Sequence, residues 1–454
     1  MLNDRYGRSH TATSPEAIVA FEEATLAIAA HRQPGPFLAR ALELEPDLPA
    51  AWAMRALGNS LLGRTEAMTA AKADHERAKS SLLRNGGGTP CERALVSAAF
   101  EASHGHLHAS ATVLEDHLKN KPRDLLAAKL SHAMRFMSGQ PELMLATTSQ
   151  VLPYWSDETP GYGFLLGCHA FGLEEIGQYR QAEVMGRRAV ELEPTDAWGL
   201  HAVSHVMEMS GRVDEGIAWL EGSRPIWPDC NNFRFHLGWH LALFYLEQGH
   251  HSRVLELYDR DVMPAASDDF RDMANAVSLL WRLRQAGVPV GSRWEQLRDI
   301  ALKRRSDVTY VFASLHYLLA LVANKEVSAA VGLLSELVHA ADEDYGDQAD
   351  VARNVGIDLA QIIQAYLSTT AKPGAEMSDI ACRLTQLGGS NAQRDLFLRI
   401  LIVAASDAED RGTLSAITKL RSQLRWQDRF ARGMLAQPSL AAFAGANPGL
   451  RGLM

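Results

Sequence analysis

The sequence predicts an all-α protein in which antiparallel helix pairs follow one another as a right-handed α-solenoid. Two observations predict this fold class. Residues that cap helices precede stretches of helical apolar periodicity throughout the 454 residues, whereas the alternation typical of strands is almost absent. In addition, helical segments with similar internal spacing recur along the chain, which is the pattern of a repeat protein.

The clearest repeat unit has the spacing of a tetratricopeptide repeat, in which small side chains let two paired helices approach closely. The segments 34–46 and 110–122 share several of its offsets. An Ala-rich bundle with chance proline spacing is the alternative, but agreement across three segments favours a tetratricopeptide-like solenoid. The residues of the clearest unit are Gly177, Tyr179, Ala182, Gly186, Ala189 and Pro194.

We expect one continuous array over residues 1–435. Breaks in the helical pattern occur at 85–90, 223–228, 264–269 and 372–374, and none is long enough or simple enough in composition to be an interdomain linker. The remaining residues, 436–454, are rich in proline and glycine, so we expect a loosely ordered C-terminal tail.

Composition limits the partners and the location. Charged residues make up 22% of the chain and the net charge is −9, without a basic stripe, so nucleic acid and anionic membranes are poor partners. No apolar run approaches the roughly 20 residues that span a bilayer, and the N-terminus lacks a secretory signal. The four cysteines are far apart in sequence. We therefore expect a cytoplasmic protein, with a homodimer kept as a candidate assembly.

The most informative stretch runs from Pro194 to Arg212. Polar residues at its start can cap a helix, and Gly211 is a natural end. Between them His201, His205 and Glu208 stand at i, i+4 and i+7, which puts them within about 60° of one another around a helix. We expect a helix that carries these three side chains on one face.

A second histidine pair, His236 and His240, repeats the i, i+4 spacing around Trp239. A pair at this spacing with a nearby carboxylate can hold Zn²⁺ or Fe²⁺. The pattern is not that of an H-E-x-x-H metalloprotease, because the glutamate lies beyond both histidines of the first pair. The metal ligands that this interpretation predicts are His201, His205 and His240.

Two other interpretations of the histidines stay open. In a catalytic or ligand-binding site without metal, His201 or His205 acts as a general base and Glu208 orients it. In a structural network, hydrogen bonds from His to Glu to Arg set the register of the helices. Buried imidazoles are costly unless both ring nitrogens are bonded, so several close together favour a function more than one histidine would.

Further polar residues stand on apolar helices or at helix starts. The spacing of Ser390 and Gln393 after a Gly-Gly turn predicts a capping box. The N-terminus of this helix together with Arg394 could hold an anion, because backbone N–H groups are unpaired there. A plain helix start is the alternative. Arg282 and His316 lie in apolar helices and could face a shared concavity, although such side chains more often cap a neighbouring helix.

Motifs along most of the chain, in order, carry a family resemblance. They are Phe171 to Glu175, Tyr179 to Glu183, Pro194 to Trp198 with His201, His205, Glu208 and Met209, then His236, Trp239, His240, Ala242 and Leu243, Tyr258-Asp259, Leu280, Arg282, Leu283, Arg293-Trp294, His316, and Leu387 to Asp395. Together they resemble the tetratricopeptide repeat protein 38 family. The resemblance implies an α-helical repeat fold and an intracellular protein, but little chemistry.

The sequence departs from that family at three positions. Acidic residues are common in the family where this chain has Asn275, Ser314 and Asn354. Each substitution removes a negative charge and keeps a hydrogen-bonding group. A role that needs carboxylates at these positions, such as metal binding or general-base catalysis, is therefore in doubt here.

These observations predict a concave pocket lined by His, Glu and Arg, which binds a small anionic molecule, and they leave open whether the molecule is also transformed chemically. The alternative is a scaffold that binds a peptide or partner protein along the solenoid groove. Histidines clustered on apolar helices favour the pocket, because a peptide groove usually carries scattered Lys, Arg and Asn. The predicted lining residues are His201, His205, Glu208, His236, Trp239, His240, Arg282, His316 and Arg394.

Overall fold

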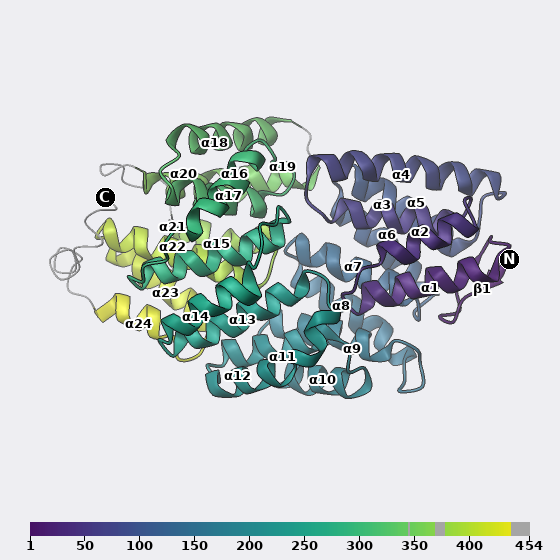
Figure 1. Ribbon diagram of the computed structural model, residues 1–454, viewed down its shortest axis with the longest axis horizontal. Helices are drawn as coiled ribbons and strands as arrows, with labels where there is room; N and C mark the ends of the chain where they lie inside the picture. The colour runs from purple at the N-terminus through teal and green to yellow at the C-terminus, as the bar shows by residue number, and fades with distance from the viewer. Residues whose placement is uncertain (344–345, 368–376, 437–454) are drawn as a thin grey trace. The chain divides into compact units, whose positions relative to one another are not determined.

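The computed structural model describes residues 1–343, 346–367 and 377–436 (Figure 1). Helices form nearly all regular structure in this part, and neighbouring helices pack in pairs, so the predicted all-α fold is confirmed. Contacts gather in two compact units, Met1–Val206 with Ser223–Phe233 and Met207–Gly222 with Arg234–Met454. The single continuous array stays a prediction.

The first unit begins with a short hairpin and continues as helices that pack on their sequence neighbours, such as α1 on α2, α3 on α4 and α9 on α10. The boundary with the second unit falls in α11 (Ala197–Met209). The other elements are β1 (Leu2–Asn3), β2 (Ser9–His10), α1 (Pro15–Ala29), α2 (Gly35–Leu44), α3 (Pro49–Ser60), α4 (Thr65–Arg84), α5 (Pro90–Ser103), α6 (Leu107–Asn120), α7 (Leu125–Met137), α8 (Pro141–Val151), η1 (Leu152–Tyr154), α9 (Tyr162–Glu175), α10 (Tyr179–Leu192) and η2 (Arg224–Asp229).

Helix α10 has the buried face that the repeat offsets predict. Its buried residues are Tyr179, Ala182, Gly186 and Ala189. A Cβ added at Gly186 would lie 2.7 Å from Cγ2 of Val203 on α11, so a larger side chain would push the two helices apart. Small residues at these offsets therefore set the close packing of the repeat.

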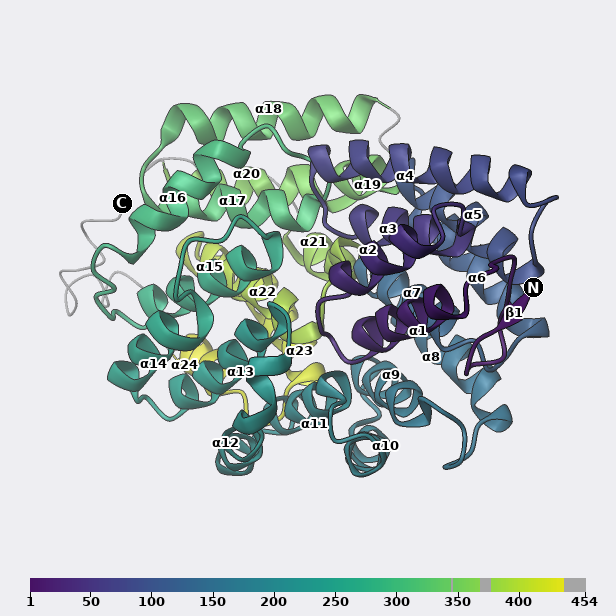
Figure 2. The same ribbon diagram turned by 45° about the vertical axis from the view of Figure 1, so that its right-hand side comes forward.

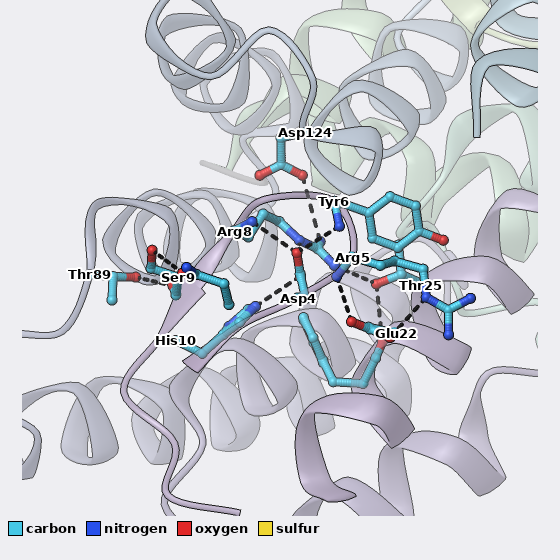
Figure 3. A network of polar contacts seen from close by, with 12 residues as sticks. Asp4, Arg5, Tyr6, Arg8, Ser9, His10, Glu22, Thr25, Thr89 and Asp124 are labelled. Atoms are coloured by element: carbon cyan, nitrogen blue, oxygen red, sulfur yellow. Dashed lines mark hydrogen bonds and ion pairs between the residues drawn. The ribbon is translucent and has the colours of Figure 1, made fainter. Parts of the chain in front are cut away.

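The sequence did not predict the two short strands before α1. They pair antiparallel, with Leu2 opposite His10. In the turn between them, buried Arg8 donates to Asp4 (2.6 Å) and to Thr25 on α1 (3.0 Å), as Figure 3 shows. Buried ion pairs and hydrogen bonds hold this hairpin, and two-residue strands are too short to show apolar alternation.

The second unit is also built from helices packed on their neighbours, and α17 packs against α15, α16 and α20 (Figure 2). Its elements are α12 (Val213–Gly222), α13 (Phe233–Glu247), whose first residue belongs to the first unit, α14 (His251–Leu257), η3 (Tyr258–Val262), α15 (Phe270–Gln285), α16 (Arg293–Arg304), α17 (Val311–Ala323), α18 (Val327–Asp342), α19 (Asp347–Val351), η4 (Ala352–Gly356), α20 (Ile357–Ala365), α21 (Met377–Arg383), η5 (Leu384–Leu387), α22 (Asn391–Asp407), α23 (Arg411–Leu424) and α24 (Arg429–Ala436).

Local signals at helix ends agree with the sequence prediction. Ser390 accepts from the backbone N–H of Gln393, whose side chain accepts in turn from the backbone of Ser390, so the capping box of α22 is confirmed.

Among the described helices, none has both the length and the apolar character needed to cross a bilayer. The predicted tail, apart from Ala436, and the break at 372–374 lie outside the described residues.

Candidate functional site

Helix α11 carries three of the residues that the sequence singled out. Asp196 caps its start, because the two carboxylate oxygens accept from two backbone N–H groups of the first turn, at 3.2 and 3.0 Å. Gly211 follows its end with a φ of 71°. His201 and His205 belong to the first unit, and Glu208 belongs to the second.

The cap at Asp196 depends on a glycine in the preceding repeat. Asp196 is fully buried, and burial raises the pKa of its carboxyl group to about 7. A Cβ added at Gly167 on α9 would lie 2.1 Å from Oδ2 of Asp196. The missing side chain at Gly167 therefore makes room for the carboxylate that starts the histidine-bearing helix.

In the first unit, His201 and His205 meet through their ring nitrogens. The two Nε2 atoms are 2.8 Å apart, and both rings are buried. Behind them, Oε2 of Glu174 on α9 lies 3.4 Å from Nδ1 of His205. Glu174, Glu175 and His205 each offer a ligand atom within 4.8 Å of the others. A carboxylate beside Nδ1 favours a proton on that atom, and such an acceptor is the usual outer partner of a metal-ligating histidine.

Aromatic rings surround this pair. Phe171 stacks on His201 with centroids 5.4 Å apart, and Trp198 lies 4.6 Å from Phe171. The Trp198 indole donates to Nε2 of His132 at 3.1 Å. Burial, together with the charge of Lys129, lowers the pKa of His132 to about 3, so this ring is neutral and can accept. The surroundings of His201 are therefore largely apolar.

In the second unit, His236 and His240 on α13 repeat the ring-to-ring contact, with Nε2 atoms 3.2 Å apart. Nδ1 of His240 lies 2.9 Å from Oε2 of Glu208, and Nδ1 of His236 lies 2.8 Å from Oδ1 of Asn275 on α15. A carboxylate or amide oxygen only accepts, so both Nδ1 atoms carry protons in this arrangement. The two Nε2 atoms then face each other with their lone pairs.

The second oxygen of Glu208 binds an arginine. Arg425, which follows α23, donates to Oε1 of Glu208 at 2.9 Å and to Glu247 at 3.3 Å. Burial acts to lower the pKa of Arg425, but Glu208 and Glu247 outweigh it and raise that pKa, so the guanidinium stays charged. The chain from His240 through Glu208 to Arg425 is the connection that the structural-network alternative predicts.

Trp239 and Arg282 lie next to the second pair. Trp239 is fully buried, and its ring stacks on His236 with centroids 5.1 Å apart. The guanidinium of Arg282 lies 5.8 Å from the Trp239 ring centroid. Arg282 also donates to Asp395 at 3.2 Å and to Ser278. Its charge is therefore balanced by an internal carboxylate.

His316 and Arg394 make local contacts. The Phe312 carbonyl accepts from Nδ1 of His316 at 2.7 Å. Burial, aided by the charge of Arg282, lowers the pKa of His316 to about 4. Arg394 donates to the carbonyl of Gly389 and, at 2.8 Å, to the side chain of Asn391. Arg394 thus supports the turn that precedes α22.

The structure brings together subsets of the predicted site residues. His236, His240 and Glu208 form one contact chain, and the histidines at 201 and 205 form another with Glu174. One metal site shared by His201, His205 and His240 would join residues of both units and stays a prediction. Of Asn275, Ser314 and Asn354, the residue described in contact with a site histidine is Asn275.

Sequence reasoning missed two sets of residues. Glu174 stands 34 residues before Glu208, which is one repeat period and is the signal that could have found it. Cys91, His117 and Asp124 come from three different elements and meet only in the folded chain. Burial lowers the pKa of His117, but hydrogen bonds to Asp124 and Cys91 outweigh it and raise the pKa to about 9.

No family model matches this sequence.

Proposed function

We propose that this protein is a helical-repeat protein that binds a divalent transition-metal ion, zinc or iron, at its histidine pairs, and binds a small ligand through that ion. The observation that carries the proposal is the arrangement of His236 and His240. Both Nδ1 atoms face oxygen acceptors, at 2.8 and 2.9 Å, while their Nε2 atoms lie 3.2 Å apart.

Two lone pairs at this distance repel each other unless a cation lies between them. A shared proton is one such cation, and a metal ion is the other. Neutral imidazole is a preferred ligand of zinc and iron, and an acceptor behind each Nδ1 strengthens the Nε2 donor. The first unit offers a related but longer contact, because Oε2 of Glu174 lies 3.4 Å from Nδ1 of His205, compared with 2.9 Å between Glu208 and His240.

The small ligand would bind the metal ion directly. A metal held by two or three protein ligands keeps positions open for an exogenous donor, and an anion is the natural choice because it neutralises the ion. The two arginines of the predicted pocket lining already bind protein groups: Arg282 binds Asp395, and Arg394 binds Gly389. Glu208 has the role of orienting His240 in this proposal.

The alternative is a scaffold in which the histidines are structural and a peptide or partner protein binds elsewhere on the helices. The link from Arg425 through Glu208 to His240 favours it, because a proton shared between the two Nε2 atoms would complete a continuous network. The two proposals differ in one measurable property, which is the retention of a metal ion.

We also propose that the protein is related to the tetratricopeptide repeat protein 38 family, which it resembles in sequence, and that it is located in the cytoplasm. Under it, the partner is a small molecule, with neither nucleic acid nor membrane involved. Detection of the tagged full-length chain in the soluble fraction of lysed cells, without pelleting with membranes, tests the location.

The metal proposal predicts that His240→Gln loses a tightly bound ion. Full-length protein is stripped with a chelator, dialysed and titrated with Zn²⁺ by calorimetry. We expect the substitution to weaken binding at the second-unit pair by at least about 100-fold, because it removes a ligand rather than an outer partner. His316→Asn is the matched control, since His316 is buried in the same unit. Equal Zn²⁺ binding by wild type and His240→Gln would rule the proposal out.

A gain of function gives a second test. Asn275→Asp places a carboxylate behind Nδ1 of His236, which makes the Nε2 atom a better donor, so we expect metal affinity to rise by about 10-fold to 100-fold. The circular dichroism spectrum serves as the control for folding. An Asn275→Asp variant that folds normally but binds metal no better than wild type would support the structural network instead.

A further inference from the structure

A second group of metal-ligating side chains, made of other residues than the histidine pairs, lies within the first unit. Cys91 is the second residue of α5, His117 lies in the last turn of α6, and Asp124 is the residue before α7. Each offers one ligand atom, and the three atoms lie within 4.8 Å of one another. Thiolate, imidazole and carboxylate are donor types that zinc takes in proteins.

The group is buried and already linked by hydrogen bonding. Nε2 of His117 lies 3.0 Å from Oδ2 of Asp124, and their side chains are 7% and 3% exposed. Cys91 is 3% exposed. A thiol, an imidazole and a carboxylate brought together out of water lose hydration, and a divalent ion would compensate all three.

Two helix starts hold the donors in place. The capping box of Thr89 and Glu92 fixes the first turn of α5, which carries Cys91. Oδ1 of Asp124 accepts from the backbone N–H of Ala127 and thereby caps α7, leaving Oδ2 directed at His117. The ligand atoms are thus positioned by backbone contacts and need little rearrangement to bind an ion.

Arg8 provides an independent observation. Its side chain is 2% exposed, and its Nη1 atom has no hydrogen-bond acceptor among the described residues. This atom points at Asp124, with 3.6 Å between Nη1 and Oδ1 (Figure 3). A buried guanidinium nitrogen without an acceptor costs free energy, and a water or hydroxide bound to an ion at this site would supply the acceptor.

We propose that Cys91, His117 and Asp124 form a zinc site, with water as the fourth ligand and Arg8 as its hydrogen-bond donor. Zinc binding replaces two protons, one from the Cys91 thiol and one from the imidazole of His117. The divalent ion adds two positive charges while two protons leave, so the charge of the buried group does not change. The site is separate from the histidine pairs of the proposed function.

Cobalt titration of the chelator-stripped full-length protein tests the site, because a Co²⁺–thiolate bond gives an intense near-ultraviolet charge-transfer band that histidine ligands do not give. We expect the wild type to develop this band at one equivalent, Zn²⁺ to remove it, and Cys91→Ala to lack it. Cys168→Ala is the matched control, since Cys168 is also buried in the first unit. A wild type that shows no such band, or a band that persists in Cys91→Ala, would overturn the proposal.

Two further measurements keep the test decisive. If Cys91→Ala fails to fold, X-ray absorption at the zinc edge of the wild-type protein should show a zinc–sulfur distance of about 2.3 Å beside lighter ligands at about 2.0 Å. A spectrum without sulfur overturns the site. His240→Gln should keep the cobalt–thiolate band, so loss of metal from the histidine pair and loss of it from the cysteine site are distinguishable.

Discussion

At the scale of single residues, a histidine's surroundings decide whether its ring can be charged. Nδ1 of His316 donates to the carbonyl four residues earlier at 2.7 Å, and His104 makes the same local contact at 2.8 Å. His316 is buried, with a pKa lowered to about 4, whereas His104 is exposed. The hydrogen bond is the same, so burial with a nearby cation accounts for the lowered pKa.

This difference predicts an acid-sensitive contribution to stability. The folded protein holds His316 neutral, while the unfolded chain binds a proton near pH 6.5, so the free energy of unfolding falls as the pH drops from 6.5 to 4. The full effect is about 3 kcal/mol. We expect His316→Asn, which keeps a donor near the Nδ1 position, to remove that part of the pH dependence.

Urea unfolding at several pH values between 4 and 7 measures this slope. His104→Asn is the control, because this histidine makes the same backbone contact at an exposed position. Parallel pH profiles for wild type and His316→Asn would contradict the assignment of a buried neutral ring.

At the scale of the element, close packing depends on where glycine stands in a helix. A Cβ added at Gly238 on α13 would lie 2.6 Å from the backbone carbonyl oxygen of Asp261 in η3. Gly332 on α18 has no atom within 4 Å of the corresponding position. Both glycines are inside helices, so the two positions differ mainly in the atoms that an added Cβ would meet.

We predict opposite effects for the same substitution. Gly238→Ala should destabilise the protein by about 1–3 kcal/mol, since backbone cannot rotate away as a side chain can. Gly332→Ala should stabilise it by up to about 1 kcal/mol, because alanine has the better helix propensity. Thermal unfolding of both variants measures the contrast. A Gly238→Ala protein as stable as the wild type would mean that α13 and η3 pack less closely than this distance indicates.

At the scale of the whole chain, buried charges connect segments that are far apart in sequence. Asp395 on α22 binds Arg282, 113 residues earlier, at 3.2 Å and Arg421, 26 residues later, at 2.6 Å. Arg399 adds a third contact at 3.0 Å. Burial opposes the ionisation of Asp395, but the three guanidinium groups outweigh it and hold its pKa well below the usual value.

Loss of this carboxylate should be costly. Asp395→Asn leaves buried arginines without their counter-ion, so we expect a loss of about 3–5 kcal/mol in the free energy of unfolding. Asp259→Asn is the control, because the Asp259 side chain is 55% exposed and its ion pair with Arg293 should contribute less than about 1 kcal/mol. Chemical denaturation of both variants makes the comparison. Equal losses would show that burial of Asp395 has little energetic weight.

The sequence by itself determined the features that depend on a few neighbouring residues. The all-α class, the buried face of α10, the capping box at Ser390 and the spacing of both histidine pairs follow from periodicity and local hydrogen bonding. Each is decided within about one or two helical turns, where side-chain direction follows directly from residue number.

Only the tertiary structure decided which groups meet. The link from Glu208 to Arg425 spans 217 residues, and Cys91 lies beside His117 and Asp124 because three helices converge. Glu174 became part of the candidate site because α9 packs near the histidines of α11. The physical reason is that helix periodicity fixes the face on which a side chain lies, whereas its partner depends on how that face packs against a distant part of the chain.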